Sequence, residues 1–212
     1  MPCSGVIISS YTILTAAHCV DKIDLNKPIF MIHGKNKFKV ESIFVPLEYY
    51  PAIKKYHNPP SGGNLIDIHR KIAQFDIAVI NLRSELKGHY RPLKVYYKKM
   101  FSGVAVKTVG TGLVKNGSFY SSTDYAHERV GKLQVLPQGI YLTAGRNLDD
   151  PITSPGDSGG ALLYQNDVIG IIRGTSFNKL EAASIYTPLI KHKNFIQRYS
   201  KPYTKHNKLI SN

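Results

Sequence analysis

The segment with the clearest chemical potential is residues 154–160, which read Ser-Pro-Gly-Asp-Ser-Gly-Gly. A serine with glycines close on both sides favours a tight turn that exposes its hydroxyl and lets a substrate backbone approach closely. The backbone N–H of Gly156 beside that of Ser158 is what an oxyanion hole requires. The same residue types also dominate ordinary hairpin turns. Taken alone, the segment therefore indicates a turn and a nucleophile site about equally.

A serine becomes a nucleophile only beside a base, and histidine is the side chain whose ordinary pKa suits that task near neutrality. The chain has eight histidines. His18 stands in Thr-Ala-Ala-His-Cys, directly after an apolar run, where small alanines let a short turn pack tightly and point the imidazole into a cleft. For His18 taken alone, a hydrogen-bonded core histidine remains the favoured interpretation. The other seven lie among Lys, Asn, Tyr or Pro and are predicted to be solvated: His33, His57, His69, His89, His127, His192 and His206.

A third side chain is needed, a buried carboxylate that holds the imidazole in one tautomer and stabilises the imidazolium. Asp76 precedes the most apolar run of the chain, residues 77–82. Burying an acid there is costly unless the acid is paired. An aspartate that caps a strand at the end of a loop is the alternative interpretation of Asp76.

The composition excludes several classes of protein. The chain has 212 residues, 42% of them hydrophobic and 20% charged, which excludes wholesale disorder and collagen-like repetition. Two cysteines are too few for a miniprotein built on disulfides or for a zinc site of four thiolates. Lys+Arg number 28 against 14 Asp+Glu, and the net charge of +14 favours polyanionic surfaces as secondary partners. No recognition motif accompanies this charge, so we expect no specific nucleic-acid partner.

The sequence shows short runs rich in Val, Ile, Tyr and Phe, separated by turn residues. This pattern predicts an all-β fold, so we expect strands to position these side chains. The first twenty residues carry no charge, but polar residues interrupt them, so they predict two strands and a turn rather than a signal peptide or membrane span. Residues 46–63 predict a long surface loop, and the apolar residues that follow Pro188 predict a C-terminal helix before a frayed basic tail at 201–212. The predicted strands are residues 5–8, 12–14, 29–32, 37–44, 77–82, 105–110, 131–135, 139–143, 161–164, 168–173 and 182–186.

The three candidates occur in the order His18, Asp76, Ser158, each in the local setting that its role demands. The joint pattern resembles the trypsin/chymotrypsin-like serine peptidase family, through Thr-Ala-Ala-His-Cys at 15–19, Asp-Ile-Ala at 76–78 and Gly-Asp-Ser-Gly-Gly at 156–160. The resemblance implies two six-stranded Greek-key β-barrels packed together, with a C-terminal helix.

The resemblance also implies a division of the chain into three parts. Residues 1–95 would form the barrel that carries the histidine and the aspartate, without its first strand. Residues 96–187 would form the barrel that carries the serine, and residues 188–212 the helix and tail.

By the same resemblance, His18 is the general base and then the general acid, Asp76 orients it, and Ser158 forms an acyl-enzyme. The N–H groups of Gly156 and Ser158 are the oxyanion hole. Cys3 and Cys19 match the family's disulfide that clamps the histidine turn. The implied function is a secreted serine endopeptidase acting on proteins or peptides as a monomer, without metal or organic cofactor. The alternative is a catalytically impaired protease homologue that acts as a binding protein.

The substrate pocket implied by the resemblance lacks the aspartate of enzymes that cleave after Lys or Arg, because Ile152 and Thr153 stand at its base. Ser184 would line one wall, and the strand that holds the substrate backbone would include Arg173 and Thr175. Thr153 matches a threonine of glutamate-specific bacterial relatives, but Ile172 replaces their pocket histidine. Arg173 could supply positive charge there; we favour a solvated arginine at a strand end.

This chain departs most from the family pattern at its amino terminus. Active members of the family pair a freed amino terminus with the aspartate before the nucleophile, here Asp157, whereas Met1 stands only two residues before Cys3. Three explanations remain open: a fragment, another way of ordering the oxyanion turn, or a homologue without full activity.

Overall fold

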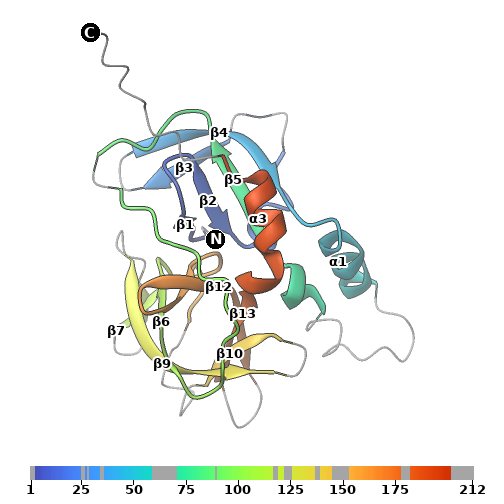
Figure 1. Ribbon diagram of the computed structural model, residues 1–212, viewed down its shortest axis with the longest axis vertical. Coiled ribbons are helices and arrows are strands. Elements are labelled where there is room, and N and C mark those ends of the chain that lie inside the picture. Colours follow the sequence, from blue (N-terminus) through green and yellow to red (C-terminus); the bar gives the residue numbers. More distant parts are fainter. Residues whose placement is uncertain are drawn as a thin grey trace.

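A computed structural model describes residues 3–24, 27, 29–33, 36–58, 71–88, 90–116, 119–121, 126–136, 139–144, 153–177 and 182–201. Two β-sheets lie at opposite ends of the molecule, the N-terminal one in blue to green and the C-terminal one in yellow to orange, and helix α3 lies alongside the first (Figure 1). Within the described residues, no helix is long and apolar enough to cross a membrane.

The N-terminal sheet is antiparallel and has the order β1-β2-β5-β4-β3. Strands β2 and β5 occupy its middle and are almost entirely buried, because their apolar runs have both faces covered. His18 lies in the turn η1 (Ala17–Cys19), which follows β2, and Asp76 stands just before β5. Because β2 and β5 pair antiparallel, His18 and Asp76 lie at the same end of the two strands. The strands are β1 (Val6–Ile7), β2 (Thr12–Thr15), β3 (Phe30–His33), β4 (Asn36–Phe44) and β5 (Ala78–Leu82).

The C-terminal sheet closes into a barrel with the order β10-β13-β12-β11-β6-β9. Closure leaves no unpaired sheet edge, and the turn that carries Ser158 leads directly into β11. A separate two-stranded hairpin, β7 (Val114–Asn116) with β8 (Phe119–Ser121), extends from it. The barrel strands are β6 (Ala105–Gly110), β9 (His127–Val135), β10 (Tyr141–Ala144), β11 (Ala161–Tyr164), β12 (Asp167–Phe177) and β13 (Ala182–Pro188).

One buried core joins the two halves. Leu14 and Val79 of the first sheet pack in the same cluster as Ile171 of the barrel and Ile196 of the C-terminal helix. That helix consists of the turn η2 (Leu189–His192) and α3 (Lys193–Tyr199). The catalytic candidates therefore stand on two sheets that cannot move apart without exposing this shared apolar surface.

The all-β fold class and the C-terminal helix are confirmed. In the described part of the chain the N-terminal sheet has five strands. The eleven predicted strands all overlap observed ones, whereas β7 and β8 were not predicted because they are short and lie among polar turn residues. The predicted frayed tail falls outside the described residues from position 202 onward.

The prediction of a loop over residues 46–63 was wrong for its first part, where α1 (Tyr49–His57) forms. Pro51 is the third residue of this helix, where the backbone N–H has no intrahelical acceptor to lose, so proline does not interrupt it. Tyr49 is fully buried and packs with Ala17 and Ile72, which holds the helix beside the histidine turn. Residues 59–63 lie outside the described part of the chain.

Candidate active site

The turn that carries Ser158 is held between the two halves of the protein. Gly156 and Gly159 have positive φ values of 99° and 86°. A Cβ on Gly159 would overlap the carbonyl oxygen of Ser4 and the hydroxyl of Thr15, so only glycine fits. The N–H of Ser4 donates to the Ser158 carbonyl at 2.7 Å. These contacts fix the backbone on both sides of the serine.

The backbone donors of this turn divide into two groups. Those of Asp157, Gly159 and Gly160 donate to carbonyl oxygens of the chain. For those of Gly156 and Ser158, the predicted oxyanion hole, no acceptor exists among the described residues. Donors without an internal acceptor are available to a ligand oxygen, which is what an oxyanion hole needs.

His18 is held by Asp76 through two hydrogen bonds. Its Nδ1 lies 2.7 Å from Asp76 Oδ2, and its backbone N–H donates to Asp76 Oδ1 at 2.9 Å. Asp76 is 1% exposed, whereas the His18 side chain is 34% exposed. A carboxylate on Nδ1 keeps the proton there and leaves Nε2 as the acceptor. The buried Asp76 therefore fixes the imidazole, and Nε2 of the partly exposed His18 is left free to act as a base.

The predicted disulfide between Cys3 and Cys19 is present, with its Cα atoms 6.1 Å apart. The Cys19 sulfur lies 3.8 Å from His18 Nε2 and 3.8 Å from the Ser158 carbonyl oxygen, so the imidazole and the serine turn flank the same sulfur. Because the two sulfurs are bonded to each other, their proximity to His18 does not make a thiolate metal site.

The hydroxyl of Ser158 donates to the carbonyl of Arg173 on β12 at 3.2 Å, and not to His18. Apo enzymes often show long or misaligned catalytic hydrogen bonds. In this structure, proton transfer to His18 requires the serine side chain to rotate.

Arg173 does not project into solvent, so the favoured interpretation of this residue is corrected. Its side chain is 17% exposed, and its Nε lies 3.5 Å from Asp76 Oδ2. A buried carboxylate attracts a cation that packs beside it, because each charge alone would be costly to bury. Tyr49 lies close by: burial, and then the charges of Asp76 and Asp21, raise the pKa of its phenol, which stays protonated and donates to Asp21 at 3.0 Å.

Part of the predicted substrate pocket is brought together. The hydroxyls of Thr153 and Ser184 lie 2.7 Å apart, and both residues are buried. In the barrel, Thr175 pairs with Ser184 across β12 and β13. Arg173 points instead to Asp76, and Ile152 lies outside the described residues.

The Trypsin family model matches residues 1–196. The chain belongs to the trypsin family. An alpha-fibrinogenase, albofibrase, from Trimeresurus albolabris is 27% identical over 210 residues, covering 92% of this chain and 76% of the relative. The trypsin Tyr p 3.0101 from Tyrophagus putrescentiae is 23% identical over 208 residues, covering 94% and 72%. The resemblance drawn from the three motifs is thereby confirmed.

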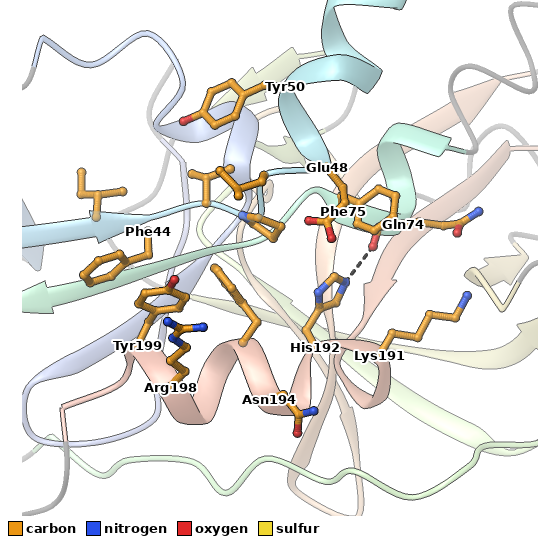
Figure 2. A pocket seen from close by; sticks show the side chains of 15 residues that line it. Phe44, Glu48, Tyr50, Gln74, Phe75, Lys191, His192, Asn194, Arg198 and Tyr199 are labelled. Atoms are coloured by element: carbon orange, nitrogen blue, oxygen red, sulfur yellow. Dashed lines mark hydrogen bonds between the residues drawn. The ribbon is translucent and has the colours of Figure 1, made fainter.

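A cavity of about 700 Å³ lies apart from these groups in this trypsin-family chain (Figure 2). It opens between the end of β4, the residues before α1, and the C-terminal helix, and aromatic, aliphatic and charged side chains line it. His192 lines it, and the prediction that this histidine is solvated was wrong, because the side chain is buried and donates from Nε2 to the Gln74 carbonyl at 2.7 Å. None of the residues predicted to act in catalysis lines it.

Sequence reasoning missed Arg129, which lies on β9 and pairs with the buried Asp157 at 2.8 Å. β9 begins four residues before the predicted strand, in His-Glu-Arg-Val, where charged residues conceal the strand pattern. Extending the alternation of polar Lys132 and Gln134 with apolar Leu133 and Val135 back along the chain could have placed Arg129 on the same face as Leu133.

Proposed function

We propose that this chain is a serine endopeptidase that uses His18, Asp76 and Ser158. The observation that carries the proposal is the doubly bonded His18–Asp76 pair beside a glycine turn that leaves two backbone N–H groups for a ligand. Membership of the trypsin family supports the same chemistry. Because the histidine and the serine come from different sheets, the arrangement is not explained by local turn formation.

In the proposed reaction, Ser158 rotates away from the Arg173 carbonyl and gives its proton to His18 Nε2 as its oxygen attacks the substrate carbonyl carbon. The resulting oxyanion accepts hydrogen bonds from the N–H groups of Gly156 and Ser158. The imidazolium, stabilised by Asp76, then protonates the leaving amine. The C–N bond breaks and an acyl-enzyme remains, which water hydrolyses by the same steps in reverse roles.

The pocket supports cleavage after residues other than Lys or Arg. Thr153 and Ser184 contribute neutral hydroxyls that bond to each other in a buried position. The positive charge of Arg173 is directed to Asp76. We therefore propose that the pocket takes neutral side chains, small or polar.

The disulfide supports secretion into an oxidising compartment, because such bonds persist there and are rare in the cytosol. The net charge of +14 would then concentrate the enzyme on anionic surfaces. Neither property is needed for catalysis.

A fluorophosphonate probe tests the proposal, because it phosphonylates a serine only when base and oxyanion hole are assembled. We expect the wild-type protein to be labelled at Ser158, as read by mass spectrometry of the modified peptide. Replacing His18 by Ala should abolish labelling. Asp76→Asn should lower kcat by about 10⁴-fold, since it leaves the imidazole in the wrong tautomer. His57→Ala, an exposed position on α1, is the matched control and should label like the wild type.

The second candidate function is a protease homologue that binds proteins without cleaving them. The observation in its favour is the Ser158 hydroxyl, which bonds to the Arg173 carbonyl and not to the imidazole. A folded wild-type protein that takes up no probe and cleaves no member of a peptide library would favour this candidate. A cleavage profile from the same library would instead define the pocket.

A further inference from the structure

Asp157 is the most deeply buried acid beside the nucleophile, with no exposed surface. Its Oδ1 accepts from the N–H of Gly112 at 2.7 Å, and its Oδ2 accepts from the N–H of Ser154 at 2.8 Å and from Arg129 Nη1 at 2.8 Å. Burial of an ionised carboxylate is tolerated when it is paired and hydrogen-bonded. The buried charge therefore has a cation from β9 and backbone donors from the segments after β6 and before β11.

The chain is shaped to receive this carboxylate. A Cβ at Gly110 or at Gly112 would lie within 2.8 Å of the Asp157 carboxyl carbon, so side chains there would displace it. Arg129 approaches from β9, is 18% exposed, and also places Nη2 3.5 Å from the Ser154 hydroxyl. The slot and its cation therefore come from three separate segments that converge on one acid.

The backbone of Asp157 lies between the two N–H groups proposed as the oxyanion hole. With its side chain held inward, the N–H groups of Gly156 and Ser158 have no acceptor among the described residues. Without a cation, the carboxylate would be buried and uncompensated, which favours its exit to water. Because the carboxylate and the oxyanion donors share one turn, its exit would rotate those donors away.

We propose that Arg129 is the positioning residue that sets the oxyanion hole through Asp157, so that activity does not depend on a freed amino terminus. The inference rests on the proposed peptidase function and adds how that site is kept competent. Arg129 is part of the barrel whatever precedes Cys3. Other family members obtain this positive charge from an amino terminus freed by cleavage. Here Arg129 on β9 supplies it.

The test compares Arg129→Met with Arg129→Lys and with Lys132→Met, an exposed cation on the same strand. Loss of an oxyanion donor lowers kcat by about 10²–10³-fold, so we expect Arg129→Met to show a fall of that order, with KM changed by less than about threefold. Arg129→Lys should recover at least about tenfold of the lost kcat, because it restores the charge. Lys132→Met should behave like the wild type. Acetylating the amino terminus of the wild-type protein should leave kcat within about twofold.

Hydrogen exchange of the peptide spanning residues 153–160 gives a readout that does not require activity. We expect faster exchange in Arg129→Met than in Lys132→Met, at equal far-UV circular dichroism. If Arg129→Met does not fold, Arg129→Lys is compared with Lys132→Met instead. The expected changes in kcat and in the exchange of residues 153–160 are then smaller.

The inference is overturned by a folded Arg129→Met variant with wild-type kcat and exchange, or by activity that acetylation abolishes. Failure of the proposed function is a different result. In that case the wild type takes up no fluorophosphonate, while the exchange of residues 153–160 still responds to Arg129→Met.

Discussion

Replacing Cys3 and Cys19 together by Ala is expected to destabilise the protein and to disturb its site. The bond closes a sequence separation of 16 residues. In the chain-entropy treatment, a crosslink over a loop of this length contributes about 3 kcal/mol to the free energy of unfolding. For a domain of 150–250 residues, 1 kcal/mol corresponds to about 2–4 °C, so Tm should fall by about 6–12 °C.

The activity of this double variant should fall as well, because the crosslink anchors the segment that grips the nucleophile turn. Ser4, next to Cys3, donates to the Ser158 carbonyl through its N–H at 2.7 Å and to the Gly156 carbonyl through its hydroxyl at 2.9 Å. Without the disulfide, the segment around Ser4 should become poorly ordered, as chain termini do when nothing anchors them. Loss of one such hydrogen bond, about 1 kcal/mol, corresponds to a fall of roughly fivefold in kcat/KM at 25 °C.

The assay is calorimetric unfolding with and without reductant, followed by kcat/KM on a substrate from the library. Reduced wild-type protein is the control and should match the double variant, whereas reductant should leave the variant unchanged. A shift in Tm below about 2 °C would refute the entropic reasoning. A full shift with unaltered kcat/KM would refute the claim that the disulfide supports the nucleophile turn.

Two further results follow from the backbone and from burial. Gly159→Ala should lower the free energy of unfolding by about 3–5 kcal/mol, from a positive φ and from overlap with the Ser4 carbonyl and the Thr15 hydroxyl. Gly103→Ala, with φ of 91° and open space around it, should cost about 1 kcal/mol. Equal denaturation midpoints for the two variants would show that the overlap is unimportant. Burial lowers the pKa of His192, so the unfolded chain binds a proton first as the pH falls through about 6.5, and stability present above that pH is lost below it. His192→Gln can still donate to the Gln74 carbonyl and should flatten the dependence of Tm on pH between about 7.5 and 5; parallel profiles for the two proteins would contradict this.

Several features of the fold could be read from the chain because they depend on local pattern. Apolar runs with turn residues between them predicted the strands, and the apolar face after Pro188 predicted the C-terminal helix. The helix α1 was missed because Pro51 reads as a loop residue, although its place in the first turn makes it harmless. The boundaries proposed at residues 95 and 187 stay a prediction.

The candidate site divides in the same way. The motifs around the three residues predicted which side chains could act, since glycines flank Ser158, alanines precede His18 and an apolar run follows Asp76. In the structure His18 is hydrogen-bonded to Asp76. The carbonyl of Ser158 lies against the sulfur of Cys19, the residue that follows His18. Their roles in catalysis stay proposals until the labelling experiment is done.

The sequence by itself determined the fold class and the identity of the candidate side chains, because these depend on residue type and on spacing along the chain. The family resemblance that its motifs carry added the disulfide partners. Only the tertiary structure decided which charges meet. Arg129 of β9 reaches Asp157 in the turn before β11, and Arg173 turns inward to Asp76 and away from solvent. The physical reason is that a buried carboxylate takes whichever cation the packing of distant strands brings within a few ångströms, and no local pattern records that distance.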